Sequence, residues 1–95
     1  MELYRSAAAK GHAEALTRLG YCYLHGYFVA LDRLRAAELF RCAMAMGSTT
    51  GEVENNLGWY YEFEADLSQA RRYYRLALEK GHQQAKDNLI RLGGA

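Results

Sequence analysis

A recurrence at a fixed offset of 34 residues is the feature that most constrains how this chain can fold. Five positions reappear at that offset with the same residue or a similar one. The pairs are Asp32 and Asp66, Ala36 and Ala70, Phe40 and Tyr74, Ala43 and Ala77, and Gly47 and Gly81. Repeats of this length are typical of stacked helical hairpins, because a single hairpin cannot bury its apolar face alone. The recurrence therefore predicts an all-α fold, an α–α superhelix of stacked antiparallel hairpins.

Helix start and stop signals divide the chain into about six helices. Gly11 and Gly47 can each end a helix, whereas Asp32 is a good N-cap. Asp66 followed by Gln69 resembles a capping box, and polar residues 48–51 look like a linker. The expected helices span about residues 1–10, 13–25, 32–46, 52–63, 66–80 and 83–92.

These helices predict one repeat domain, residues 1–95, in which each hairpin has a first and a second helix. Residues 1–11 are an orphan second helix, 13–47 the first repeat, 52–81 the second repeat, and 83–92 a capping helix. Gly20 and Gly58 lie inside first helices, where glycine costs about 1 kcal/mol. We therefore expect the paired helix to approach too closely for a side chain. Ile90 stands at this position in the capping helix.

Large and small residues alternate at the repeated positions and predict the core. Ala36, Ala43, Ala70 and Ala77 are expected on the packed face of the second helices. Tyr4, Phe40 and Tyr74 are expected to fill the space between hairpins, as are Tyr23 and Tyr61 from the first helices.

Composition removes several functional classes. The net charge is +1, so no bulk field attracts nucleic acid or an anionic membrane. No apolar run reaches the roughly 18–20 residues of a membrane span, and the start has no signal-peptide pattern. The chain as written is expected to be cytoplasmic, or periplasmic or secreted if its N-terminus is truncated.

The first unit carries a motif at fixed spacing, Ala15-x-x-x-Leu19-Gly20-x-x-Tyr23-x-x-Gly26, followed by Val29, Asp32, Ala36, Phe40, Ala43 and Gly47. This pattern resembles the Sel1-like repeat, a relative of the tetratricopeptide repeat. The second unit has lost about four loop residues between Tyr61 and Asp66, so its spacing is that of a tetratricopeptide repeat. The resemblance covers nearly the whole chain.

The resemblance implies a non-enzymatic scaffold or adaptor that binds a protein or peptide on the concave face of its first helices. By register, that face would present Tyr21, Leu24, His25, Asn55, Trp59, Glu62 and Phe63. Trp59 is the only tryptophan and lies one turn from Phe63, as expected of an aromatic hot spot. The alternative is that Trp59 packs between hairpins. Residues 1–10 would join a second copy or a longer solenoid.

Other functions stay open as alternatives. Some compact relatives are immunity-type inhibitors of bacterial toxins, and some cysteine-rich relatives are hydrolases, although no residue set here supports catalysis. Cys22-x-x-His25 has metal-ligand spacing, but zinc would need Cys42 and a further ligand to converge. We expect buried or free thiols, with no metal and no cofactor.

Overall fold

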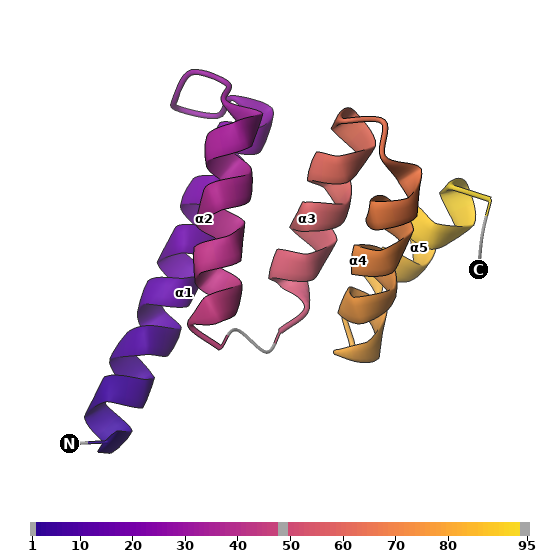
Figure 1. Ribbon diagram of the computed structural model, residues 1–95. Helices are drawn as coiled ribbons and strands as arrows, with labels where there is room; N and C mark the ends of the chain where they lie inside the picture. Colours follow the sequence, from indigo (N-terminus) through magenta and orange to yellow (C-terminus); the bar gives the residue numbers. More distant parts are fainter. Residues whose placement is uncertain (1, 48–49, 94–95) are drawn as a thin grey trace. The chain divides into compact units, whose positions relative to one another are not determined.

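The computed structural model describes residues 2–47 and 50–93, and within them it contains five α-helices and no strand (Figure 1). The helices are α1 (Glu2–His25), α2 (Arg33–Ala45), α3 (Glu52–Phe63), α4 (Leu67–Glu79) and α5 (Gln84–Arg91). The chain forms two compact units, Met1–Ser48 and Thr49–Ala95. The predicted all-α architecture of helical hairpins is confirmed. The first predicted repeat lies in the first unit, and the second repeat and the predicted capping helix lie in the second.

Helix α1 differs from its prediction, because it runs without a break through Gly11. The sequence predicts a helix end at this glycine, and hence six helices. Glycine only weakens a helix interior, and a Cβ at position 11 would meet nothing within 4 Å. The local signal is therefore too weak to end α1 without packing on both sides of a turn. The glycines with positive φ at helix ends are elsewhere, for example Gly26 and Gly81.

The helices that follow the two loops begin where their caps predict. The Asp32 side chain accepts a hydrogen bond from the backbone N–H of Arg35 at 3.1 Å. Asp66 accepts one from the N–H of Gln69 at 3.2 Å. Each bond satisfies an N–H that the first turn of a helix leaves unpaired. The reciprocal half of the capping box does not form, since the Gln69 side chain accepts from Arg72 instead.

The two mid-helix glycines allow the close helix approach that the sequence predicts. In the first unit, a Cβ on Gly20 would lie 2.9 Å from Cδ1 of Phe40. In the second unit, a Cβ on Gly58 would lie 2.5 Å from Cδ1 of Tyr74. Both rings are fully buried. Each ring therefore packs on the glycine of its own hairpin, and Tyr74 also belongs to the buried cluster that includes Ala85 and Leu89 of α5.

Buried residues of the first unit lie on one face of each helix. On α1 they recur at the three- and four-residue spacing of a helix face, at Ala13, Thr17, Gly20 and Leu24. On α2 they are Ala36, Ala37, Phe40 and Ala43. The contact between Gly20 and Phe40 shows that these two faces meet.

In the second unit, α4 packs against both α3 and α5. The buried cluster comprises Ala70, Tyr74, Ala77, Ala85 and Leu89, with Trp59, Tyr61, Leu78 and Leu92 packed against it. Lys80, which caps α4, forms an ion pair with the buried carboxylate of Glu54 in the first turn of α3. This core fixes α3, α4 and α5 around one another and so positions the side chains described next.

Candidate interaction surface

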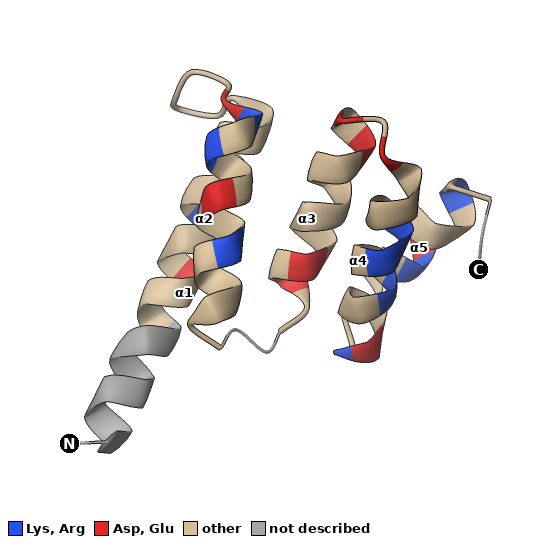
Figure 2. Ribbon diagram, in the orientation of Figure 1, with Lys and Arg blue, Asp and Glu red and all other residues tan. Residues whose placement is uncertain are grey.

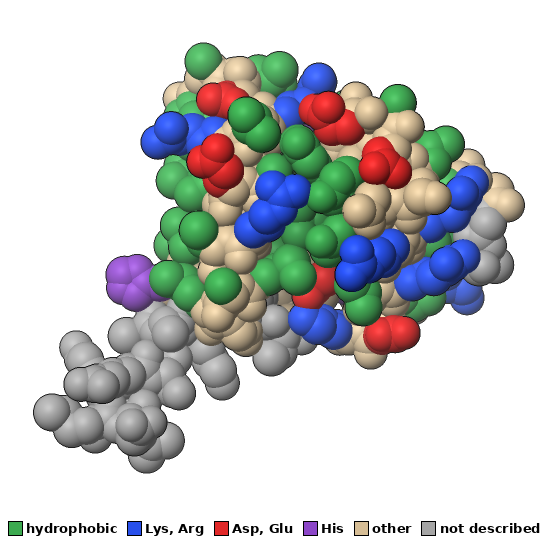
Figure 3. Space-filling model, in the orientation of Figure 1, with side chains coloured by type: hydrophobic (Ala, Val, Ile, Leu, Met, Phe, Trp, Pro, Cys, Tyr) green, Lys and Arg blue, Asp and Glu red, His purple; other side chains and the backbone are tan. Residues whose placement is uncertain are grey.

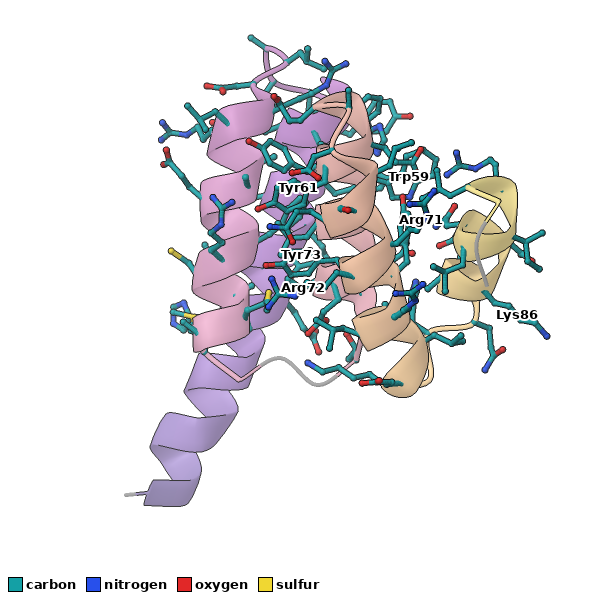
Figure 4. The ribbon with its side chains drawn as sticks, turned by 45° about the vertical axis from the view of Figure 1, so that its right-hand side comes forward. Trp59, Tyr61, Arg71, Arg72, Tyr73 and Lys86 are labelled. Carbon is teal, nitrogen blue, oxygen red and sulfur yellow. The ribbon has the colours of Figure 1, made fainter. Side chains whose placement is uncertain are left out.

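Two aromatic rings one helical turn apart form the centre of the candidate surface on α3. Trp59 is half-buried, Phe63 is 41% exposed, and their ring centroids are 6.2 Å apart at 29°. Trp59 also packs against the core formed by α4 and α5, and Figure 4 shows it on the side of α3 nearest α5. The packing alternative thus holds for part of the Trp59 ring. Phe63 presents the more exposed apolar surface.

Arg91, near the end of α5, covers Trp59 and bonds to the same helix. Its guanidinium lies 5.2 Å from the Trp59 ring centroid, within the range of a cation–π contact. The same group donates two hydrogen bonds to the Glu62 carboxylate, at 2.8 and 2.5 Å. A bidentate pair of this kind fixes orientation as well as distance. Arg91 therefore holds α5 to α3 and limits the movement of Trp59.

Glu62 is the junction of this network, since it also accepts a hydrogen bond from the Tyr74 hydroxyl at 2.5 Å. Partial burial raises the pKa of Glu62, but the hydrogen bonds from Arg91 and Tyr74 outweigh it, and the net pKa lies below its usual value. Burial, together with the bond to Glu62, raises the pKa of Tyr74. The carboxylate is thus held ionised and the phenol neutral. The prediction that Glu62 contacts a partner is untested, although both of its oxygens already accept bonds from within the unit.

A buried amide pair continues the link between α3 and α5. The Asn88 side chain donates to the Asn55 side chain at 2.9 Å, and Arg91 donates to Asn88 at 3.2 Å. Asn55 is 2% exposed. Its predicted place on a partner-facing surface is therefore corrected, because the side chain lies in the interior between two helices.

Charge is segregated along the second unit (Figure 2). Helix α3 and the turn after it carry Glu52, Glu54, Glu62, Glu64 and Asp66 and no Lys or Arg. Helices α4 and α5 and their turn carry Arg71, Arg72, Arg75, Lys80, Lys86 and Arg91. Figure 3 shows several basic side chains gathered on one face of this unit. Lys80 and Arg91 pair internally with α3 acids. The other four basic residues outnumber Glu79 and Asp87, so the remaining charge on α4 and α5 is basic.

A second aromatic cluster of this unit contains Tyr61 and Tyr73. Their rings stack at 5.4 Å with an interplanar angle of 10°, and the Arg72 guanidinium lies 5.6 Å from the Tyr73 centroid. Figure 4 shows these three side chains together, apart from Trp59 and Arg71. Tyr61 is half-buried against the core, in agreement with its predicted packing role.

The three site residues predicted on α1 do not share one environment. Tyr21 is exposed, and its ring lies 4.4 Å from that of half-buried His25. Tyr27 completes this cluster, with its centroid 5.5 Å from His25. Burial, with a smaller effect of Arg33, lowers the pKa of His25. Leu24 is 0% exposed, so its predicted place on the binding face is corrected to the hairpin core.

The network around Glu62 is the part that the sequence prediction missed. The sequence places Arg91 on the capping helix but gives no sign that it reaches Glu62, 29 residues earlier. One sequence signal does indicate a polar contact at this place in the second unit. Tyr74 carries a hydroxyl where the first unit has Phe40, and a buried hydroxyl requires a partner.

The residues that the structure describes were also searched for disulfides, metal sites and membrane spans. Cys22 is half-buried and Cys42 exposed, and both are free thiols. Among these same residues, no three His, Cys, Asp or Glu side chains come together as a metal site would require. None of the described helices is both long and apolar enough to span a bilayer.

Comparison with known families gives a match to the Sel1 repeat. The family model matches residues 1–12, 13–48 and 51–82, which together make up most of the chain. Searches of curated proteins and of solved structures found no significant match.

Proposed function

The chain belongs to the Sel1 repeat family, and on this premise we propose that its second unit binds a protein or peptide through Phe63, Trp59 and Arg91. Sel1 repeats are generally protein–protein interaction modules and non-catalytic scaffolds. The proposal extends that general role to one surface of this chain. It treats the protein as an adaptor without catalytic activity.

The observation that carries the proposal is an exposed aromatic ring supported by a rigid neighbour. Phe63 is 41% exposed and stacks on Trp59, whose ring is in turn covered by Arg91. The Glu62 carboxylate holds Arg91 by two hydrogen bonds. Aromatic and arginine side chains dominate binding hot spots, and pre-ordering them lowers the entropy lost on association.

The charge around this surface supports a partner with acidic side chains beside its apolar contact. Lys86 and Arg91 are exposed on α5, while Arg71 of α4 donates a hydrogen bond to the backbone oxygen of Leu92 at 3.3 Å. Complementary charge speeds encounter and fixes orientation more than it adds affinity. The association rate should therefore fall as salt is raised, whereas the aromatic contact sets the dissociation rate.

Site-specific photocrosslinking tests the surface directly. A photoreactive phenylalanine at position 63 should capture one dominant protein in the source cells, and the same residue at exposed position 34 should not. With the captured protein purified, Phe63→Ala should weaken Kd about 5- to 30-fold, as for loss of a hot-spot residue. Leu34→Ala is the matched control, because Leu34 is also an exposed apolar side chain. Equal affinity of wild type and Phe63→Ala would rule out this surface.

A further inference from the structure

We infer that the loop between α1 and α2, residues 26–32, contacts a lipid bilayer and inserts the side chains of Phe28 and Leu31 into its surface. The inference concerns the first unit alone and does not depend on the binding surface proposed for the second. The sequence prediction of no membrane partner rests on the net charge of +1 and on the absence of an apolar run of spanning length. Shallow insertion of a loop requires neither, because its strength depends on the apolar area that enters the bilayer.

The first observation is the exposure of Phe28. Its side chain is 99% exposed, whereas Phe63 of the second unit is 41% exposed and stacks on Trp59. Leu31, three residues further along the same loop, is 52% exposed. The ring of Phe28 therefore has almost no contact with the rest of the described chain, and burial within the fold does not explain why it is there.

The backbone at Phe28 indicates a role outside the fold. Its φ of 65° lies in the left-handed region, which glycine adopts freely and a bulky side chain only with strain. Strained residues of this kind cluster at functional sites. The α3–α4 loop has the same feature at Ala65, with φ of 61°, but there the neighbours are Glu64 and Asp66. Of these two strained loop positions, only that of the first unit presents a large apolar side chain.

The side chains next to Phe28 suit the interface between hydrocarbon and headgroups. Tyr27 is 50% exposed and packs at the end of α1, with its ring centroid 5.5 Å from that of His25 and 5.9 Å from that of Tyr21. Tyrosine is enriched at this depth of a bilayer, because its ring is apolar and its hydroxyl is polar. The aromatic cluster would thus lie at the level of the headgroups when Phe28 is inserted.

The charges that follow the loop favour an anionic lipid. The loop and the first turn of α2 carry Asp32, Arg33 and Arg35. The Asp32 carboxylate accepts a hydrogen bond from the backbone N–H of Arg35, so it is occupied as the cap of α2. Arginine bonds phosphate oxygens through two parallel N–H groups, and basic residues beside a membrane are attracted to anionic lipids. We therefore expect a lipid surface that contains phosphatidylglycerol or a similar anionic headgroup.

The shape of the loop fits a lipid surface better than a protein groove. Figure 1 shows the loop at the end of the α1–α2 hairpin, beyond the last turns of both helices. An aromatic hot spot in a protein interface is surrounded by contacts that exclude water, and Phe28 has no such neighbours in the described chain. A bilayer encloses a projecting side chain from all sides and needs no surrounding contacts on the protein.

Co-sedimentation of the full chain with vesicles of phosphatidylcholine and phosphatidylglycerol tests the inference. Wild type should bind, and Phe28→Asn should lower the partition coefficient about 10-fold because one large apolar side chain no longer enters the bilayer. Asparagine adopts positive φ at low cost, so this variant should keep its fold, which circular dichroism checks. Ile90→Ala is the matched control, since Ile90 is an exposed apolar residue of α5, and it should bind as wild type does. Absence of wild-type binding, or equal binding of Phe28→Asn, would overturn the inference.

Tryptophan fluorescence locates the loop independently of affinity. In a Trp59→Phe chain, Phe28→Trp supplies the only tryptophan. Its emission should shift to shorter wavelength with vesicles and be quenched by lipids with brominated acyl chains, whereas that of Ile90→Trp in the same background should not. Emission from position 28 that stays typical of water in the bound chain contradicts insertion. Binding that disappears at high salt also contradicts it, because charge would then carry the attachment. A shift caused by a lipid-free cell extract and not by vesicles would assign the loop to a protein partner instead.

Discussion

In the α1–α2 hairpin the ring of Phe40 lies over Gly20, and in the α3–α4 hairpin the ring of Tyr74 lies over Gly58. The two hairpins differ at the next turn of the first helix. Leu24 follows Gly20 by four residues, and Glu62 follows Gly58 by four residues. The hairpin with the apolar ring thus has a leucine at this position, and the hairpin with the phenol has a glutamate.

These two substitutions give the second hairpin a polar contact that the first hairpin does not have at the same positions. In the first hairpin the ring completes a core, and Leu24 is fully buried. In the second, the Tyr74 hydroxyl bonds to Glu62, and Glu62 bonds to Arg91 of the following helix. The Tyr74 hydroxyl is therefore linked through Glu62 to Arg91 of α5, and Arg91 in turn covers the Trp59 ring.

The largest effect should come from adding a methyl group under each aromatic ring. Gly58→Ala places a Cβ 2.5 Å from Cδ1 of Tyr74, and Gly20→Ala places one 2.9 Å from Cδ1 of Phe40. We expect a loss of about 3 kcal/mol for Gly58→Ala and about 1–2 kcal/mol for Gly20→Ala, as for overpacked cores. Urea unfolding measured by circular dichroism checks both. Trp59 fluorescence reports the second unit separately.

The order of these two losses is the informative result. Tyr74 is held at its hydroxyl by Glu62, so its ring cannot move aside as freely as that of Phe40. If Gly20→Ala cost more than Gly58→Ala, the hydroxyl bond would not restrain the ring. Gly93 has open space around it, and Gly93→Asn provides a neutral reference.

Exchanging the two rings should have the next largest effect. Phe40→Tyr adds a hydroxyl to a fully buried ring in the hairpin that has Leu24, not a carboxylate, four residues after its glycine. The change should cost about 2 kcal/mol because a buried donor is left unpaired. Tyr74→Phe removes one hydrogen bond to a carboxylate that Arg91 still satisfies, and should cost about 1 kcal/mol. Thermal unfolding of both variants measures the difference. Equal costs would show that the Tyr74 bond to Glu62 carries no specific stability.

The repeat positions explain why the fold was more predictable than the site. Glycine under an aromatic ring and aspartate caps are local or periodic signals, and α2 and α4 begin where the aspartate caps place them. The contact between Glu62 and Arg91 joins residues 29 apart, and it depends on how α5 crosses α3. No periodicity encodes that crossing.

The misassigned residues fail for a related reason. Leu24 and Asn55 were placed by register on an open face, but register gives only the side of a helix and not what covers it. Asn55 is covered by Asn88 of the next helix. The helix end predicted at Gly11 is wrong for the same reason, because a glycine ends a helix only where the packing around it favours a turn.

Acid should weaken the second hairpin through Glu62. Its pKa in the folded chain lies below the usual value of 4.5, so the unfolded chain binds the proton more tightly. This contribution is therefore complete above about pH 4.5 and is lost as pH falls toward the lower folded pKa. Urea unfolding followed by Trp59 fluorescence between pH 6 and pH 3 should show the loss. Glu62→Gln should flatten that part of the profile, while a Glu64→Gln control should not.

The smallest effect should be a gain in stability at the two loop residues with strained backbones. Phe28 in the α1–α2 loop has φ of 65°, and Ala65 in the α3–α4 loop has φ of 61°. Asparagine adopts this region at lower cost, so Phe28→Asn and Ala65→Asn should each stabilise by about 0.5–1 kcal/mol. Phe28 is also 99% exposed, so its replacement removes no packing within the chain. Glu64→Asn, at an exposed position of the α3–α4 loop with φ of −85°, should give no gain, and calorimetry would distinguish the three variants. A Phe28→Asn chain that melted lower than wild type would show that the aromatic ring stabilises this loop despite its exposure. Backbone strain would then determine the effect of asparagine only in the α3–α4 loop.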